Sequence, residues 1–406
     1  MSLSTARLTL EAVAAVGSFC SLLFYCLSAG SIVSFLGDRR RQLNQPEPLE
    51  SQLPPVSILK PLKGIDPEIW ESFCSHCEQN YPEFQLIFGV SDPRDPAIEI
   101  VHKLQAKYPN LSIDLVVCNL LLGANIKVSN LAQMLPAARH DLLLINDSDI
   151  RVPSGYLRNV TAPLGDATVG LVTCLYRGIA SPTLGSRLEA LGISTDFVPG
   201  VLSARLLEKG LHFGLGSTLA FRRRDLETIG GFEALLDHLA DDYELGRQIA
   251  ATGKRVELGA AIVTTFLPAY SLRQFFLHQL RWLRTIRDAR RRGYGGLVFT
   301  FGVPWALLTV LASRGAGWAW ALFALVFSVR VAVGFAAVEI VLHDRRTFRR
   351  ELLRTILLMP LRDLIAPLVW AVSLMGNRIH WRGDVFELRD GRLTTRKAAP
   401  AADWKK

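Results

Sequence analysis

The sequence predicts an α/β domain combined with transmembrane helices. Half of the 406 residues are hydrophobic and the mean hydropathy is +0.24, which is unusually apolar for a soluble protein of this length. Apolar runs long enough to cross a bilayer lie near the N-terminus and in the last third of the chain. Between them, short apolar strands alternate with helical stretches, a pattern that predicts a parallel α/β sheet.

The first apolar run covers residues 12–36 and contains no charged residue. A secretory signal peptide is the alternative, but the run is too long and Glu11 stands where a basic region is expected. Three arginines, residues 39–41, follow the run, so the positive-inside rule places the chain after them in the cytoplasm. We therefore expect residues 1–44 to form an N-terminal transmembrane anchor.

A cytoplasmic domain is expected over residues 45–270, after a proline-rich linker. Ligands of parallel sheets bind beyond the carboxyl ends of the strands, and Asp92 and Asp147 both follow predicted strands. The segment 197–207 is amphipathic, and either contact with a membrane or an ordinary core helix explains it. Strands are expected at 56–59, 84–90, 113–118 and 141–145, and helices at 69–79, 97–108, 125–137 and 243–252.

The last part of the chain is predicted to associate with the membrane. Residues 271–293 carry a basic amphipathic helix that is typical of the membrane interface. A C-terminal transmembrane region, 294–376, contains candidate spans at 297–312 and 316–342, and a final stretch, 355–376, that is either a span or a re-entrant element. Residues 377–406 form a polar, basic tail.

Net charge and cysteine content narrow the class of partner and the compartment. The formal charge is +9, which favours nucleic acid, anionic lipid or phosphate as partners. Most arginine clusters flank apolar runs, and the sequence contains no nucleic-acid-binding module. We therefore expect the protein to associate with a membrane and not to bind nucleic acid. The six cysteines indicate no disulfide framework, and Cys74 and Cys77 lack a second metal-ligand pair, so a reducing compartment is expected for the catalytic part.

Two pairs of carboxylates and the single carboxylate Asp92 are candidate functional residues. Asp147 and Asp149 form an Asp-x-Asp directly after an apolar strand, and such oxygen ligands suit Mg²⁺ or Mn²⁺ with substrate phosphates completing the shell. Asp92 is either a nucleoside ligand or a turn carboxylate. Asp241 and Asp242 open a helix, either as cap and dipole charges or with a general base whose pKa its neighbour raises.

An aromatic residue and a basic residue that are neighbours on the interfacial helix form a further candidate binding site. Arg281 can bind phosphate oxygens through its planar fork, and Trp282 offers a stacking face. Trp and Arg also favour the membrane interface for its own sake, and both interpretations can hold together.

Seven motifs in this order resemble the membrane-bound, family-2-like glycosyltransferases. The resemblance is strongest to the ceramide glucosyltransferase family (glycosyltransferase family 21), close to the bacterial hopanoid-associated N-acetylglucosaminyltransferases. It covers the chain from the first apolar run to about Trp381. The motifs are SILKPLKG at 57–64, Asp92 with DPAI at 95–98, GANIKVSNL at 123–131, DSDIRV at 147–152, GLV at 170–172, ADDY at 240–243 and the Arg281-Trp282 pair.

The resemblance implies a GT-A type nucleotide-diphosphosugar transferase domain and a role for each matching residue. Asp242 would be the catalytic base and Asp149, with Asp147, the ligand of Mg²⁺ or Mn²⁺. The nucleotide sugar, a UDP-sugar donor, would contact the residues Lys60, Asp92, Lys127, Asn130, Asp147, Arg281 and Trp282.

The activity expected from the resemblance is inverting transfer of a hexose from a UDP-sugar to a lipid hydroxyl. Ceramide glucosylation is the leading hypothesis, and a hopanoid-biosynthesis N-acetylglucosaminyltransferase is the alternative, because His278 and Asp149 match that branch better. The acceptor would be ceramide or a hopanoid. The protein would be a multi-pass protein of the bacterial inner membrane, with its catalytic domain in the cytoplasm.

Two further hypotheses are weaker. A processive polysaccharide synthase needs several spans after the catalytic domain, and only two clear ones follow here. A membrane scaffold that merely binds nucleotide would be expected to lack Asp149 or Asp242, and both are present.

Overall fold

The chain divides into two structural units, each assembled from segments that are far apart in the sequence. The computed structural model describes residues 2–46, 49–342, 345–381 and 384–395. The helical unit consists of Met1–Leu36, Pro182–Leu206 and Ala269–Gly383. The sheet unit consists of Gly37–Ser181, Leu207–Pro268 and Asp384–Lys406. Residues 396–406, the end of the predicted basic tail, lie outside the described residues.

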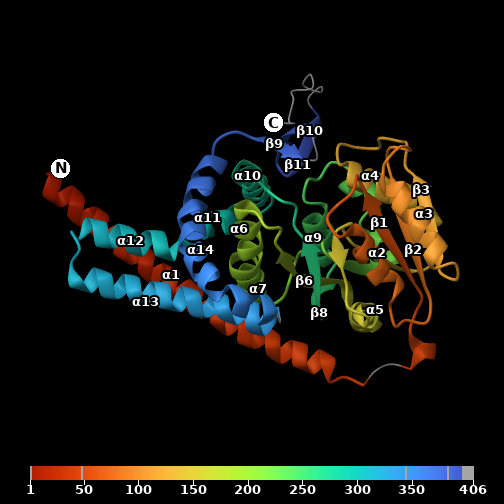
Figure 1. Ribbon diagram of the computed structural model, residues 1–406, viewed down its shortest axis with the longest axis horizontal. Helices are drawn as coiled ribbons and strands as arrows, with labels where there is room; N and C mark the ends of the chain where they lie inside the picture. Colours follow the sequence, from red (N-terminus) through yellow and green to blue (C-terminus); the bar gives the residue numbers. More distant parts are fainter. Residues whose placement is uncertain (1, 47–48, 343–344, 382–383, 396–406) are drawn as a thin grey trace. The chain divides into compact units, whose positions relative to one another are not determined.

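An eight-stranded sheet is the centre of the sheet unit (Figure 1), with the strand order β3-β2-β1-β4-β7-β6-β8-β5. Strands β1 and β2 are buried along their whole length, as the near-continuous apolar sequences of central parallel strands require. The strands are β1 (Val56–Leu62), β2 (Phe84–Val90), β3 (Ser112–Val117), β4 (Leu142–Ile145), β5 (Ile150–Arg151), β6 (Val169–Ile179), β7 (Leu219–Arg222) and β8 (Arg255–Phe266).

The prediction of a parallel sheet is right for the four predicted strands and holds only in part for the rest of the sheet. Strands β3, β2, β1 and β4 are parallel neighbours, and so are β6 and β8. Strand β7 is antiparallel to both β4 and β6, and β5 is antiparallel to β8. Strands and helices alternate strictly only as far as β4. Between β6 and β7 the chain leaves the sheet unit for the helical unit, so this segment does not supply the crossover helix that a parallel connection needs.

The helices expected at 69–79 and 97–108 begin where predicted, the one at 125–137 begins one residue later and the one at 243–252 begins two residues earlier. All four end slightly earlier than predicted. The predicted helix at 125–137 is divided into α4 and a 3₁₀ turn, because Pro136 cannot continue the α-helical hydrogen bonds. The core contains the ring pair Phe73 and Phe88, whose centroids lie 4.6 Å apart. The helices are α2 (Ile69–Cys77), α3 (Ala97–Lys107), α4 (Ile126–Met134), α5 (Tyr156–Thr161), α8 (Arg223–Thr228) and α9 (Asp241–Ala251), with 3₁₀ turns at Glu50–Gln52, Leu135–Ala137, Ala162–Gly165 and Phe232–Leu235.

Part of the polar C-terminal region forms a hairpin in the sheet unit. Strands β10 (Asp384–Arg389) and β11 (Arg392–Thr395) pair antiparallel. Backbone hydrogen bonds join this hairpin to the loop before α9, from Leu239 N to Gly391 O at 3.2 Å and from Leu393 N to Asp237 O at 2.6 Å. The hairpin therefore supports the loop from which α9 begins.

Within the described residues, four helices are long and apolar enough to cross a membrane. They are Leu3–Leu43, Leu184–Leu207, Gly317–Glu339 and Ile356–Ser373, and a fifth candidate is the pair Arg291–Thr300 and Gly302–Ala312, bent by 51°. The elements involved are α1 (Leu3–Leu43), α6 (Leu184–Gly192), the π-helix η4 (Ile193–Phe197), α7 (Val198–Leu207), α10 (Leu272–Ala289), α11 (Arg291–Gly296), the 3₁₀ turn η6 (Leu297–Thr300), α12 (Gly302–Ala312), α13 (Gly317–Phe335), the π-helix η7 (Ala336–Val341) and α14 (Arg345–Ser373), and strand β9 (Arg378–Trp381) follows in the same unit.

These helices match the predicted apolar runs with two differences. The expected span at 297–312 is broken at Phe301, whose backbone leaves the helical region between η6 and α12. Segment 184–207 has the length and hydropathy of a span, whereas the sequence predicts contact with the membrane only for the amphipathic part 197–207. Glu189 and Asp196 interrupt its apolar sequence, so the segment does not stand out as an uncharged apolar run.

Close contact between α9 and the loop before β7 gives a test of this fold. A Cβ at Gly246 would lie 2.1 Å from the backbone nitrogen of Gly214. Because backbone atoms cannot move aside cheaply, Gly246→Ala should lower the free energy of unfolding by about 1–3 kcal/mol. A Cβ at the exposed Gly165 would have nothing within 4 Å, so Gly165→Ala is the control. Equal thermal unfolding temperatures for the two variants in detergent would contradict this packing.

Candidate functional site

Acidic side chains gather where β4 ends and α9 begins. After β4, the buried Asn146 donates hydrogen bonds to Tyr156 Oη at 2.8 Å and Ser217 O at 2.6 Å. This neutral amide anchors the turn that carries Asp147 and Asp149 to the strands and helix around it. The apolar sequence of β4 and the polar turn after it therefore place the Asp-x-Asp at the edge of the sheet, as predicted.

Lys127 is the cation at the centre of this group. Its Nζ lies 2.8 Å from Asp147 Oδ1 and 3.2 Å from Asp241 Oδ2, and only 17% of its side chain is exposed. Burial opposes the charged form, but the carboxylates of Asp147 and Asp241 outweigh it and raise the pKa of Lys127. Lys127 therefore stays protonated and joins the end of β4 to the start of α9.

Asn125 holds the first turn of α4 in the same place. Its side-chain oxygen accepts the Val128 amide as the N-cap, and its side-chain nitrogen donates to His238 O at 2.7 Å. The same nitrogen lies 3.3 Å from Asp241 Oδ1. The Asn125 side chain thus caps α4 and binds the loop that leads into α9.

Asp242 and Asp147 border the same glycine. A Cβ at Gly216 would lie 3.1 Å from Oδ2 of Asp147 and 3.1 Å from Oδ2 of Asp242, so the absence of a side chain leaves both oxygens room. Burial and the neighbouring Asp241 raise the pKa of Asp242 to about 6, while Lys127 opposes the rise. Asp242 is therefore ionised at neutral pH and still a stronger base than an exposed aspartate.

Asp149 and Lys60 lie on the other side of the turn. Thr265 Oγ1 donates a hydrogen bond to Asp149 Oδ2, and burial and Asp147 raise the pKa of Asp149 to about 6. Lys60 is completely buried and its Nζ donates to the main-chain oxygen of Asp147 at 3.0 Å. Burial lowers the pKa of Lys60 to about 7, although Asp149 and Asp147 oppose the shift.

Asp92 follows the end of β2, and Asn130 of α4 lies beside the same strand end. Asp92 is exposed, and the Arg94 backbone amide that it accepts at 2.9 Å lowers its pKa. Asn130 is buried and accepts the hydroxyl of Ser91, the residue before Asp92, at 3.0 Å. Among the contacts of the described residues, none joins Asp92 to the acidic group, so its nucleotide role stays a prediction.

Arg281 and Trp282 belong to α10 in the helical unit. The Trp282 ring packs edge-on against Phe197 at 5.5 Å between centroids and lies 5.8 Å from the His278 ring. The expected contact of Arg281 and Trp282 with a diphosphate stays a prediction.

The carboxylates at the Asp-x-Asp have the chemistry of a divalent-cation site. Mg²⁺ uses one or two protein carboxylates and takes its other ligands from water and substrate phosphates. Asp147 and Asp149 supply two. Burial and, after it, repulsion from Asp147 raise the pKa of Asp149, and a bound cation would relieve that repulsion. Among the described residues, no group of three or more His, Cys, Asp or Glu side chains could hold a metal by itself. The residues therefore fit a cation that substrate phosphates complete.

Sequence reasoning missed three contributors to this site. Asp241 was considered as a cap or a modulator of its neighbour, and its ion pair with Lys127 was not expected. Gly216 was one of several glycines in a mixed region, and only the close carboxylates distinguish it. Thr265 is 116 residues from Asp149, and no local pattern marks it.

Comparison with known proteins identifies the class and then the family. The sequence model described as glycosyl transferase family 21 matches residues 15–394. The protein is therefore a glycosyltransferase. It belongs to glycosyltransferase family 21, the family of the ceramide glucosyltransferases, as its motifs predicted.

The relatives align over most of their length. Ceramide glucosyltransferase 1 of Caenorhabditis elegans is 24% identical over 382 residues, which cover 90% of this chain and 78% of that protein. The ceramide glucosyltransferase of Komagataella phaffii is 25% identical over 430 residues, covering 84% of each chain. Together with the observed sheet and apolar helices, family membership confirms the predicted fold class.

One solved structure with a similar arrangement is the mannosyltransferase PcManGT from Pyrobaculum calidifontis in complex with GDP-Man and Mn²⁺. It is 20% identical, with a TM-score of 0.46 over 88% of this chain and 99% of that chain. This similarity is too distant to bear on substrate or mechanism.

The charge of Lys127 should be visible in the pH dependence of activity. Lys127 lowers the pKa of Asp242, so Lys127→Met should raise that pKa above its value of about 6. A carboxylate base works only when ionised, so the acid limb of kcat/KM should move to higher pH by about 1 unit. Lys127→Arg keeps the charge and should leave the limb near its wild-type position. An unshifted limb in Lys127→Met would contradict the coupling.

Proposed function

We propose that this glycosyltransferase moves glucose from UDP-glucose to the hydroxyl of ceramide, with inversion at the anomeric carbon. The observation that carries the proposal is that proteins named ceramide glucosyltransferase align with 84–90% of this chain. The geometry of the acidic group supports it, because a raised-pKa carboxylate and a candidate cation site border one glycine.

Asp242 is the proposed general base. Its carboxylate accepts the proton of the ceramide hydroxyl as that oxygen attacks the anomeric carbon from the face opposite the diphosphate. The bond between the acceptor oxygen and the anomeric carbon forms, the bond to the diphosphate oxygen breaks, and UDP leaves with the electron pair. A pKa of about 6 suits this role, because the group is ionised at neutral pH and remains basic.

The remaining residues of the site bind and orient the donor. Asp149 and Asp147 would hold Mg²⁺ or Mn²⁺, which when bound supplies positive charge that stabilises the leaving diphosphate. Lys127 holds the Asp147 carboxylate through its ion pair. The proposed nucleotide contacts come from residues at the strand ends and from α10, namely Lys60, Asp92, Asn130, Arg281 and Trp282.

We place the protein in the bacterial inner membrane as a multi-pass protein with its catalytic domain in the cytoplasm. Four described helices could cross a membrane, and basic residues 39–41 follow the apolar part of α1. A cytoplasmic site has direct access to UDP-sugars, and a membrane enzyme has access to a lipid acceptor.

Sugar transfer by the purified protein in detergent tests the donor and acceptor. UDP-glucose and UDP-N-acetylglucosamine are each combined with ceramide and with a hydroxylated hopanoid, and products are identified by mass. We expect glucosylceramide, with activity lost on chelation and restored by Mg²⁺ or Mn²⁺. An N-acetylglucosaminyl hopanoid as the product would overturn the ceramide proposal, and full activity in chelator would overturn the cation site.

The base is tested by Asp242→Asn. Loss of the proposed proton acceptor should lower kcat about 10²–10⁴-fold while UDP binding is retained. In the wild type, kcat/KM should fall about tenfold per pH unit below pH 6, as Asp242 becomes protonated. Asp166→Asn, an exposed carboxylate elsewhere in the sheet unit, is the matched control. Turnover by Asp242→Asn within a few-fold of wild type would remove its assigned role.

A further inference from the structure

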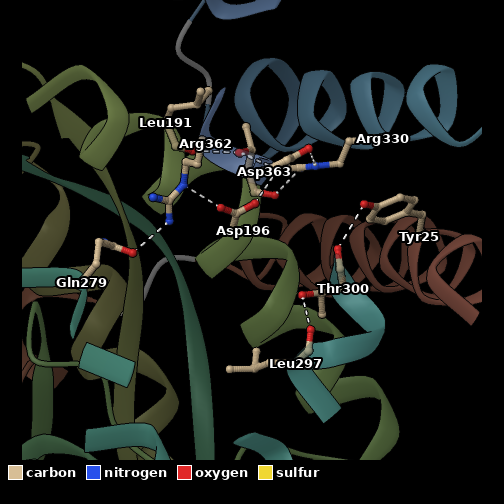
Figure 2. A network of polar contacts seen from close by, with 10 residues as sticks. Tyr25, Leu191, Asp196, Gln279, Leu297, Thr300, Arg330, Arg362 and Asp363 are labelled. Atoms are coloured by element: carbon tan, nitrogen blue, oxygen red, sulfur yellow. Dashed lines mark hydrogen bonds and ion pairs between the residues drawn. The ribbon is translucent and has the colours of Figure 1, made fainter. Parts of the chain in front are cut away.

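A chain of charged groups runs through the helical unit and has no part in the proposed chemistry (Figure 2); Arg330, Arg362 and Asp363 are buried in it, and Asp196 is partly exposed. Arg330 of α13 lies 2.8 Å from Asp363 of α14 and 2.5 Å from Asp196 of η4. The other oxygen of Asp196 accepts Arg362 Nε at 2.7 Å. Two guanidinium groups and two carboxylates therefore meet inside this unit, and their formal charges balance.

The same chain reaches the interfacial helix α10 through Gln279. The Arg362 guanidinium donates to Gln279 Oε1 at 3.2 Å, and Gln279 Nε2 donates to Glu189 Oε2 at 2.7 Å. The other Glu189 oxygen lies 3.2 Å from His278 Nδ1, and the Glu189 residue is only 1% exposed. One amide on α10 is thus bound on both sides by charged groups from α6 and α14.

The surrounding backbone is shaped for these contacts. Gly192 of α6 leaves room for a guanidinium, because a Cβ there would lie 2.1 Å from Arg362 Cζ. The π-helical turn η4 follows at once, and Arg330 Nη1 donates to its Thr195 carbonyl at 2.9 Å. Single π-helical turns are uncommon and frequently mark functional positions.

Charged groups in apolar helices are costly and are kept where they perform a task. A buried ion network adds little net stability compared with apolar packing, but it permits few alternative arrangements. Gln279 satisfies both Arg362 and Glu189 only in a narrow range of rotation of α10 about its axis. The network is therefore better suited to setting an orientation than to stabilising the fold.

We propose that this network sets the orientation of α10 and thereby of Arg281 and Trp282, with Gln279 as the positioning residue. Trp282 lies on the next turn and contacts Phe197, the neighbour of Asp196, so the network and the aromatic contact act on the same helix face. The inference rests on the proposed function only for the roles of Arg281 and Trp282 in transfer.

Gln279→Met tests the proposal in the full-length protein. Methionine has a similar shape and no hydrogen-bonding amide, so the helix should remain folded while its link to Arg362 and Glu189 is lost. We expect kcat to fall about tenfold or more with little change in KM for the donor. Arg273→Met, at an exposed position of the same helix, is the control and should keep wild-type kcat.

The ¹⁹F NMR signal of Trp282 reports orientation without relying on activity. The protein is labelled with 5-fluorotryptophan, and Trp282→Phe assigns the signal among the eight tryptophans. We expect the Trp282 signal to shift or broaden in Gln279→Met and to stay unchanged in Arg273→Met. An unchanged signal in Gln279→Met would overturn the proposal.

Arg281→Ala separates this inference from the proposed function. If Gln279 acts through Arg281, adding Gln279→Met to Arg281→Ala should cost little further kcat, whereas independent losses would contradict positioning. If Arg281→Ala alone has full activity, the assigned role of Arg281 fails and the Trp282 signal still decides the orientation.

If Gln279→Met does not fold, Arg362→Lys tests the same proposal. It keeps a positive charge near Asp196 but lacks the fork that also reaches Gln279. The same shift of the Trp282 signal and loss of kcat are expected, and neither would appear if the network had no influence on α10.

Discussion

The site depends on the ion pairs of one ammonium group, that of Lys127. Lys127 forms ion pairs with Asp147 and Asp241, and Asp242 and Asp149 lie close by. Four carboxylates in so small a volume would repel one another strongly without an internal cation. Because the ion pairs join α4, the end of β4 and the start of α9, the electrostatics that make the carboxylates compatible also hold these elements together.

Neutral polar groups and glycines complete what Lys127 begins. Asn146 and Asn125 use both ends of their amides, so the turns around the acidic group are anchored without adding charge. Gly246 permits a backbone approach that any side chain would block, and Gly216 leaves room beside the carboxylates of Asp147 and Asp242. The carboxylates nevertheless remain in excess over Lys127, which matches a site that is completed by a cation and a substrate diphosphate.

The two units handle buried charge in different ways. In the sheet unit the acidic group keeps an excess of negative charge and raised carboxylate pKa values, which favour proton transfer and cation binding. In the helical unit Arg330 and Arg362 balance Asp196 and Asp363, as expected for groups that orient helices and do no chemistry. The first arrangement is reactive and the second is structural, although both are built from the same residue types.

The local sequence pattern alone determined the strands β1 to β4, the helices between them and most apolar spans. It also located Asp92, Asp147, Asp149 and Asp242 at strand or helix ends. Neighbouring residues are enough for this, because hydrophobic periodicity and strand ends are local features of the sequence. The motifs also determined the family. Only the tertiary structure decided the antiparallel pairing of β7 and β5, the ion pair of Lys127 with Asp241, the contact of Thr265 with Asp149 and the charge network of segment 184–207. Each of these joins residues far apart in the chain, and their partners are chosen by packing, which no local pattern records.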